Sequence, residues 1–310
     1  MPEALRICTI SVDLDEIPNY HAIHGLPPPA APGASAVYER AVDRLVKFAK
    51  ARGIPLTFFA VGADLRDEAN AAKLRAAAAL GHEIANHSLD HGYDLTRHSI
   101  AEMTRQVQES ARLIEDAVGV RPKGFRAPGY VMTDNLAQIL AATGVYYDSS
   151  VFPCPAYYAA KASAMALILA RGRTSRSIVD HPKVLLAPRR PYRMGKRYHL
   201  PGSGIVELPV QVTRWLRLPF IGTALTLAGP TVAKAIAHAV VGEPVVTLEL
   251  HGIDVLDAED GLGALLPVQP DVRVSLAEKL TTLDEVVRLL RHEGYAFVRS
   301  DEAAAAVYRS

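Results

Sequence analysis

The chain has 310 residues, of which 49% are hydrophobic and 22% are charged, and its formal net charge is +1. A nearly neutral chain is not an expected nucleic-acid binder, so we predict no nucleic-acid partner. The length suits one large α/β domain with a substantial core, and we predict a single domain over residues 1–310. Cys8 lies inside an apolar strand pattern and is expected to be a core residue, not a disulfide partner.

Two features bear on where the protein resides. The chain enters a strand-like pattern almost at once, without the basic and apolar regions of a signal peptide. The longest uncharged run, residues 218–233, is interrupted by prolines and glycines and is too short for a membrane-spanning helix. We therefore predict a cytoplasmic protein that does not span a membrane.

Strand-like and helical patterns alternate along most of the chain. Predicted strands cover residues 5–13, 54–61, 82–86, 125–128, 145–148, 244–250 and 295–298. Predicted helices cover about 35–52, 99–118 and 276–293, with an Ala-rich helix that ends at Leu80, a helix that ends near Ala142, and a Pro-rich loop over 27–33. Gly53 is expected to end the first of these helices. Repeated strand–helix units favour a parallel sheet or a (β/α) barrel.

The section from about 152 to 243 breaks this alternation, and we interpret it as an insertion within the same domain. It contains an apolar helical pattern (162–170), a basic loop (171–197), a strand candidate (205–212) and an apolar stretch around Leu218. Between Lys161 and Arg217 there are twelve Lys or Arg residues against two acidic ones. This section is therefore basic and partly apolar.

Polar residues stand at the C-terminal ends of the predicted strands. They are Asp13, His87, Arg126, Asp148 and His251. In parallel (β/α) barrels the reactive groups gather at that edge of the sheet. We therefore expect these five side chains to surround one site.

His87 and His91 are four residues apart, so both imidazoles can reach one ion from a helical turn or a tight loop. Asp13 and Asp15 close the first predicted strand, and one carboxylate can bind the metal while the other handles protons. Three protein ligands with an open position are typical of a hydrolytic metal site, because structural zinc sites have four protein ligands.

The motifs together resemble the NodB-homology polysaccharide deacetylases, which form carbohydrate esterase family 4. The resemblance covers roughly residues 6–150 and 244–300. Its ordered motifs are residues 11–15, 87–91, 126–130, 148–150 and 250–251. The first motif departs from the common form because Leu14 separates the two aspartates. Some branches of the family, including allantoinase-like and peptidoglycan-directed members, carry this spaced version.

The resemblance implies a distorted (β/α)7-type barrel and a metal-dependent deacetylase. It implies a divalent metal held by Asp15, His87 and His91, with Asp13 as the general base. Zinc fits these ligands best, and cobalt, nickel and manganese are alternatives. Such an ion activates water and polarises the carbonyl group of the bond to be cleaved.

The remaining catalytic roles also follow from the resemblance. Arg126 is expected to orient the base through a bidentate contact, and the N–H of Gly129 is expected to stabilise the oxyanion. His251 is the expected general acid. Asp148 is the first candidate for the carboxylate that keeps His251 cationic, with Asp254 and Asp257 as alternatives.

The expected substrate is an N-acylated amino sugar or glycan, free or linked to a lipid or a nucleotide. Tyr130, His21 and His24 are candidate substrate contacts. The basic residues of the insertion are expected to meet phosphate, and residues 215–216 and 218–227 are expected to touch a lipid interface. The protein would then sit at the inner face of an anionic membrane, and the oligomeric state stays open. The basic residues are Arg171, Arg173, Arg176, Arg189, Arg190, Arg193, Lys196 and Arg197.

Three alternative functions compete with this prediction. The first is another C–N hydrolase on the same fold, such as an allantoinase-like enzyme or a deformylase. The second is an iron oxygenase with two histidines and one carboxylate, which leaves Asp13, Arg126 and His251 unexplained. The third is a membrane- or glycan-binding module that keeps the fold without catalysis.

Overall fold

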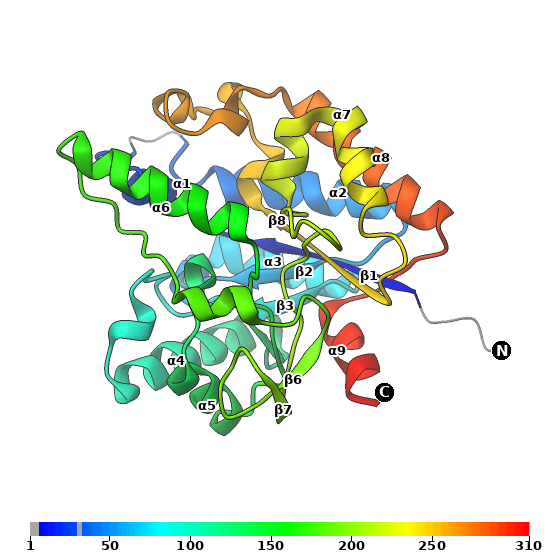
Figure 1. Ribbon diagram of the computed structural model, residues 1–310. Helices are drawn as coiled ribbons and strands as arrows, with labels where there is room; N and C mark the ends of the chain where they lie inside the picture. The colour runs from blue at the N-terminus through cyan, green and yellow to red at the C-terminus, as the bar shows by residue number, and fades with distance from the viewer. Residues whose placement is uncertain (1–5, 30–32, 310) are drawn as a thin grey trace.

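The computed structural model describes residues 6–29 and 33–309. Residues 30–32 of the predicted Pro-rich loop and residue 5 of the first predicted strand lie outside this described part. A curled sheet runs through the middle of the molecule, and helices surround it (Figure 1).

The strands of this sheet are β1 Ile7–Asp13, β2 Thr57–Ala60, β3 Glu83–Asn86, β4 Gly124–Phe125, β5 Tyr147–Asp148, β6 Tyr192–Met194, β7 Pro201–Glu207, β8 Val245–His251 and β9 Ala296–Phe297. Their order across the sheet is β6-β7-β5-β4-β3-β2-β1-β8, and β9 pairs with β1. Only the β6–β7 pair is antiparallel within the described residues.

The two ends of the curled sheet meet through the segment that follows β7. The Gln211 N–H donates to the Thr247 carbonyl of β8 at 3.3 Å, and the Thr247 hydroxyl donates to the Pro209 carbonyl. On the other side, the Leu208 N–H donates to the Asp148 carbonyl of β5 at 2.8 Å. The parallel strands β1 to β5, β7 and β8 thus enclose the interior, and the predicted distorted barrel is confirmed.

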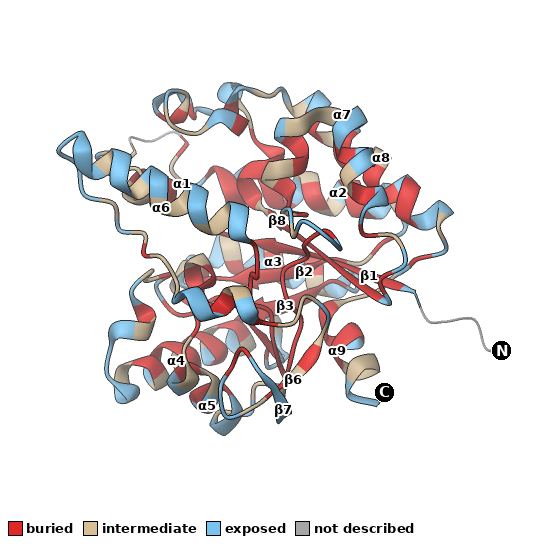
Figure 2. Ribbon diagram, in the orientation of Figure 1, coloured by how far each residue is buried: buried red, intermediate tan, exposed pale blue. Residues whose placement is uncertain are grey.

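Most of the helices lie outside the sheet with one face buried towards it, as the red inner faces in Figure 2 show, whereas the helix Pro155–Ala170 has no buried residue. Gly53 adopts φ 58° and ends the first long helix, as predicted. The α-helices are α1 Ile17–Ile23, α2 Val42–Arg52, α3 Glu68–Ala79, α4 Ile100–Val118, α5 Asp134–Ala142, α6 Pro155–Ala170, α7 Gly222–His238, α8 Leu276–His292 and α9 Ser300–Arg309. A π-helical segment, Val37–Ala41, leads into α2.

The structure differs from the prediction mainly where proline occurs and in the insertion. The strand predicted over 125–128 ends at Phe125, because the Ala127 N–H donates to the Ser150 hydroxyl at 2.8 Å instead of to a neighbouring strand, and Pro128 then starts a 3-10 turn. In the insertion, β7 ends at Glu207, before the end of the strand predicted over 205–212. No helix among the described residues is long and apolar enough to cross a membrane.

Candidate active site

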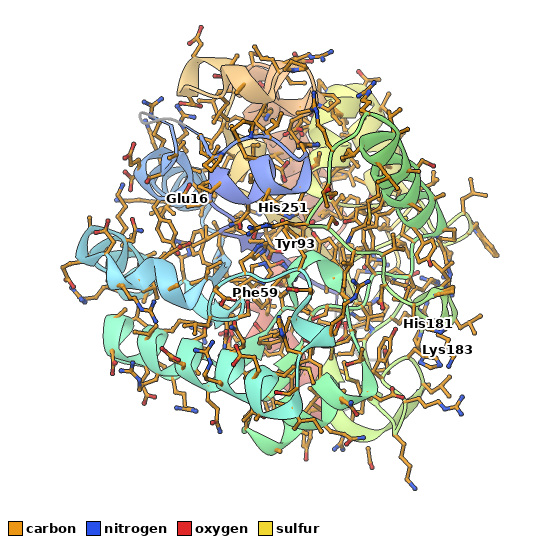
Figure 3. The ribbon with its side chains drawn as sticks, turned by 90° about the vertical axis from the view of Figure 1, so that its left-hand side faces the viewer. Glu16, Phe59, Tyr93, His181, Lys183 and His251 are labelled. Carbon is orange, nitrogen blue, oxygen red and sulfur yellow. The ribbon has the colours of Figure 1, made fainter. Side chains whose placement is uncertain are left out.

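The C-terminal ends of the parallel strands bring the expected polar side chains together. Asp13 ends β1, and His251 at the end of β8 is its direct partner in the sheet. His87 follows β3, and Arg126 follows β4. Figure 3 looks onto this edge of the barrel and shows His251 and Tyr93 near its centre.

Asp15, His87 and His91 form one buried group. Oδ1 of Asp15 lies 3.1 Å from Nε2 of His87 and 3.0 Å from Nε2 of His91, and the two Nε2 atoms are 3.2 Å apart. A ligand atom from each residue lies within 4.8 Å of the other two. Two imidazole nitrogens and one carboxylate oxygen match the donor set of a hydrolytic zinc-type site.

The hydrogen bonds of His87 and Asp15 test whether this group suits a cation. Nδ1 of His87 lies 2.7 Å from the Arg126 carbonyl oxygen, so Nδ1 carries a proton and Nε2 is free to turn its lone pair towards Asp15. Oδ1 of Asp15 is buried and has no hydrogen-bond partner among the described residues. A lone pair and a carboxylate oxygen at this distance repel unless a proton or a metal ion lies between them. These residues therefore fit a divalent ion.

A tight loop, not a helical turn, presents the two histidines. Ser88 and His91 both have positive φ, at 68° and 55°, which costs roughly 1–3 kcal/mol each in non-glycine residues. The Ser88 N–H donates to Asn86 Oδ1 at 2.9 Å, and the His91 N–H donates to Ser88 Oγ at 3.2 Å. Gln106 of α4 accepts from the Leu89 N–H at 3.2 Å. These bonds hold a strained loop in the conformation that aims both rings at Asp15.

Arg126 is buried and contacts Asp13, as expected. Its Nη1 lies 2.5 Å from Asp13 Oδ1, but its other N–H groups donate to Ser11 Oγ at 2.9 Å and to Ser149 Oγ at 2.8 Å. The predicted bidentate contact is therefore wrong, because the guanidinium divides its donors among three residues. The plane also stacks over Phe59 at 4.1 Å. Burial raises the pKa of Asp13, and the Arg126 charge opposes that rise.

The carboxylate beside His251 is Glu249, so the predicted Asp148 partner is wrong. Nδ1 of His251 lies 2.8 Å from Oε1 of Glu249, two positions earlier on β8 and therefore on the same face of the strand. Burial disfavours the imidazolium, but Glu249 and the nearby aspartates outweigh it and raise the pKa of His251 well above its ordinary value. The alternative Asp254 accepts a hydrogen bond from the backbone N–H of His251 at 2.9 Å, and not from its imidazole.

Asp148 instead forms a buried pair with Glu207, its neighbour in the β5–β7 ladder. The Ser150 hydroxyl donates to Asp148 Oδ1 at 2.7 Å, and the Val151 N–H donates to Glu207 Oε1 at 2.9 Å. Burial and the Asp148 charge raise the pKa of Glu207 well above its ordinary value. The side chain of Asp148 thus points to β7 and holds the turn after β5.

Gly129 occupies the expected position beside the site. It adopts φ 62°, and a Cβ atom there would lie 2.9 Å from the Tyr93 ring. The Tyr130 N–H donates to the Ala127 carbonyl at 3.0 Å. Lys161 of α6 donates to the Gly129 carbonyl at 2.9 Å, and burial lowers the pKa of Lys161 to about 8.

A cavity of about 600 Å³ opens beside His91. Its walls come from α1, the loop after β3, the start of α4 and the segment after α6, and they include Asn19, Asp90, Tyr93, Arg97, Ser175 and Arg176. The Tyr93 ring lies 4.9 Å from the His91 ring, edge to face. The cavity therefore leads from solvent to the His91 side of the metal-ligand group.

His21 and His24, the predicted substrate contacts, are not among the residues that line this cavity. Nδ1 of His21 lies 2.5 Å from the Pro27 carbonyl, and Nε2 of His24 lies 2.9 Å from Oε1 of Gln269. Both rings thus tie α1 to neighbouring loops. That His21 and His24 contact the substrate stays a prediction.

Sequence reasoning missed Glu249 and Tyr93. A signal for Glu249 was present, since an acidic residue inside an otherwise apolar strand, two positions before His251, must share its face. Tyr93 had no comparable signal, because its contact with Gly129 joins two loops that are far apart in the chain.

Comparison with known proteins agrees with this geometry. The family model described as polysaccharide deacetylase matches residues 33–147, a segment that contains His87, His91 and Arg126. A protein from Mycobacterium smegmatis assigned to the polysaccharide deacetylases is 17% identical, with a TM-score of 0.61 and coverage of 100% of this chain and 92% of that one.

Two other solved structures share the fold. A peptidoglycan deacetylase from Bacillus subtilis is 14% identical, with a TM-score of 0.50 over 98% of this chain and 92% of that one. A pseudoenzyme of carbohydrate esterase family 4 from Bacillus anthracis is 12% identical, with a TM-score of 0.52 over 97% of this chain and 66% of that one. The predicted resemblance to the NodB-homology polysaccharide deacetylases is thus confirmed, by sequence over residues 33–147 and by fold over the chain.

Proposed function

We propose that the protein is a metal-dependent hydrolase that removes an N-acyl group, first of all N-acetyl, from an amino sugar or glycan. The observation that carries this proposal is the buried Asp15–His87–His91 group, with Asp13 on one side and His251 4.0 Å from Asp15 Oδ2. Metal-assisted amide hydrolysis uses a metal ion held by protein ligands, a general base and a general acid. Candidates for all of these groups lie together here.

Asp15, His87 and His91 would hold the ion, with zinc as the first candidate. When bound, a divalent ion supplies Lewis-acid chemistry, which lowers the pKa of water and polarises an amide carbonyl. Asp13 lies 3.8 Å from His87 Nε2 and accepts the proton of the attacking water. Arg126 fixes the Asp13 carboxylate, so its free oxygen faces the ligand group.

His251 acts on the leaving group of the reaction as the general acid. Glu249 keeps the imidazole protonated, so His251 can donate a proton to the departing nitrogen. The N–H of Gly129 donates to the oxygen on which negative charge develops. Tyr93 and Tyr130 stand beside these groups as substrate contacts, with the Tyr130 ring 6.3 Å from the His251 ring.

Fold alone does not decide between enzyme and binding module. The Bacillus anthracis neighbour is a pseudoenzyme, and a mutant of it has restored enzymatic activity. In this chain a candidate residue stands for each catalytic role, which favours the enzyme. We further propose that the spaced aspartates assign the chain to the corresponding family branch, and that the protein works in the cytoplasm.

Metal content and acyl release, measured together, test the proposal. His87→Ala is expected to lose the metal and at least about a hundredfold in turnover, since ligand and activation are lost together. His238→Ala, a surface histidine on α7, is the matched control and should keep both. A His87→Ala protein with unchanged metal content and turnover would contradict the proposed site.

The substrate panel separates the alternatives. N-acetylated amino sugars, N-formylated amino sugars and cyclic ureides are compared under the same conditions. Acetate release from the first set supports the deacetylase. Formate release alone, or ureide opening alone, assigns the same site to a deformylase or an allantoinase-like enzyme. Full metal content without turnover on any of them supports the binding module.

A further inference from the structure

Helix α6 is apolar and yet uncovered. It has 16 residues, mostly alanine, leucine and tyrosine, and none of them is buried. Leu167 is 51% exposed and Leu169 is 72% exposed. Figure 2 shows α6 as pale blue and tan along its length, projecting past the body of the molecule beyond the strand ends. A helix of this composition normally packs into a core.

Only the N-terminal half of α6 is anchored. The Tyr157 ring packs 4.7 Å from the Phe152 ring, and Lys161 is held by the Gly129 carbonyl. Beyond Lys161, the described residues of α6 make no side-chain hydrogen bond and no ring contact with the body. One face of this second half, with Ala162, Met165 and Ile168, is half-buried, and the face with Leu167 and Leu169 is exposed.

The chain segment that contains this half of α6 and the loop after it carries only positive charge. Residues 155–179 contain no Asp or Glu, and α6 leads directly into a loop with Arg171, Arg173 and Arg176. All three arginines are exposed, and their side chains have no partner among the described residues.

Other predicted phosphate ligands in the insertion are already engaged. Arg189 and Arg190 pair with the buried Glu243, at 2.5 and 2.6 Å. Arg193 donates to the Gly204 carbonyl at 3.0 Å. Lys196 and Arg197 are also exposed, and their side chains have no hydrogen-bond or ion-pair partner among the described residues. The loop that follows α6 thus carries three of the five predicted phosphate ligands that remain free.

We propose that the C-terminal half of α6 and the arginines after it dock onto an anionic lipid surface. A helix of 16 residues spans about 24 Å, which is shorter than the roughly 30 Å hydrocarbon core that a membrane-spanning helix must cross. Apolar side chains next to arginines suit a helix that lies in the interface, with the arginines at lipid phosphates. A second copy is a poorer occupant, because a symmetric dimer through this face would bring the same arginines together.

The loop that follows α6 links this surface to the cavity. Ser175 Oγ donates to the Ile23 carbonyl at 2.7 Å, and the Arg176 N–H donates to the Ala22 carbonyl at 3.3 Å. Ser175 and Arg176 also line the cavity beside His91. Docking through α6 would therefore set the cavity mouth at the level of the lipid head groups. The inference stands without the proposed reaction, because membrane binding is measured without turnover.

Vesicle sedimentation tests the docking. The wild-type protein should bind phosphatidylcholine vesicles that contain phosphatidylglycerol, and bind far less to pure phosphatidylcholine. The double variant Leu167→Gln, Leu169→Gln should bind at least about tenfold more weakly, because two apolar side chains no longer enter the interface. Arg171→Gln and Arg173→Gln should each weaken binding about fivefold, and more salt should weaken the wild type.

The controls are exposed apolar residues elsewhere. Ile100→Gln and Val120→Gln, at the two ends of the α4 region, are 60% and 64% exposed in the native chain and should leave binding unchanged. Unchanged melting temperatures would show that the α6 variants fold. Three results would overturn the proposal: equal binding to both vesicle types, loss of binding with Trp215→Ala but not with the α6 variants, or a dimer in light scattering that Leu169→Gln dissociates.

Discussion

The strand-end site and helix α6 differ most in how far their side chains are buried and in how many partners hold them. The side chains of Asp13, His87 and Arg126 are each 1–2% exposed and fixed by several partners, whereas α6 has no buried residue. Burial and redundant hydrogen bonds give the site one geometry, which catalysis requires. The exposed helix lacks those constraints, so its composition must be explained by something outside the monomer.

The largest expected effect comes from a variant that removes a catalytic group and keeps the shape of the site. Asp13→Asn is isosteric and retains a contact for Arg126, but it removes the proton acceptor. We expect kcat to fall about a thousandfold, while metal content stays near that of the wild type. Single-turnover acyl release with metal analysis on the same sample checks this, and near-normal kcat would rule out Asp13 as the base.

Substitutions in the barrel and in α6 should also differ in how much they lower the unfolding free energy. Leu248 of β8 is 1% exposed, and Leu248→Ala should lower the unfolding free energy by about 3 kcal/mol. Leu169→Ala on α6 should change it by less than about 0.5 kcal/mol, because nothing packs on that side chain. Urea unfolding of both variants decides the point. Equal losses would mean that α6 is covered in solution.

Glu249 should matter through His251. Glu249→Gln removes the charge that raises the pKa of His251, so that pKa falls. Since a general acid must be protonated, the basic limb of the kcat profile should move to lower pH, and kcat at pH 8 should drop about thirtyfold. Glu249→Asp should restore part of this. A lower kcat with an unmoved pH profile would indicate packing damage instead.

The smallest expected effect concerns pH and stability. Glu83 is buried, accepts from Thr57 and Tyr147, and has its pKa raised by burial from 4.5 to about 7. The folded state favours protonated Glu83. The contribution of Glu83 to the unfolding free energy is therefore fully present below pH 4.5 and is lost as the pH rises towards 7. Glu83→Gln should flatten this decline by up to about 1.4 kcal/mol per pH unit.

A variant of Asp180, in the insertion, provides a comparison for Glu83→Gln. Burial also raises its pKa to about 7. If the insertion opens before the barrel unfolds, Asp180→Asn should change the slope of global stability less than Glu83→Gln does. Urea titrations at several pH values compare the two variants, and equal slopes would show that the insertion and the barrel unfold as one unit.

Much of this protein was determined by its sequence alone. Alternating strand and helix patterns predicted a parallel sheet or (β/α) barrel with polar residues at its strand ends. The resemblance to the NodB-homology deacetylases then implied the distorted barrel and the group of Asp15, His87 and His91. The resemblance also implied the contact between Arg126 and Asp13, while the strand-end pattern placed both residues at one edge of the sheet.

Other features were decided only by the tertiary structure. Asp148 turns to Glu207 and leaves His251 to Glu249, since the curl of the sheet sets which neighbour each side chain faces. The bonds of His21 and His24 depend on how α1 rotates against distant loops. The exposure of α6 depends on the absence of a covering element among the described residues. These are long-range contacts, and no local pattern encodes them.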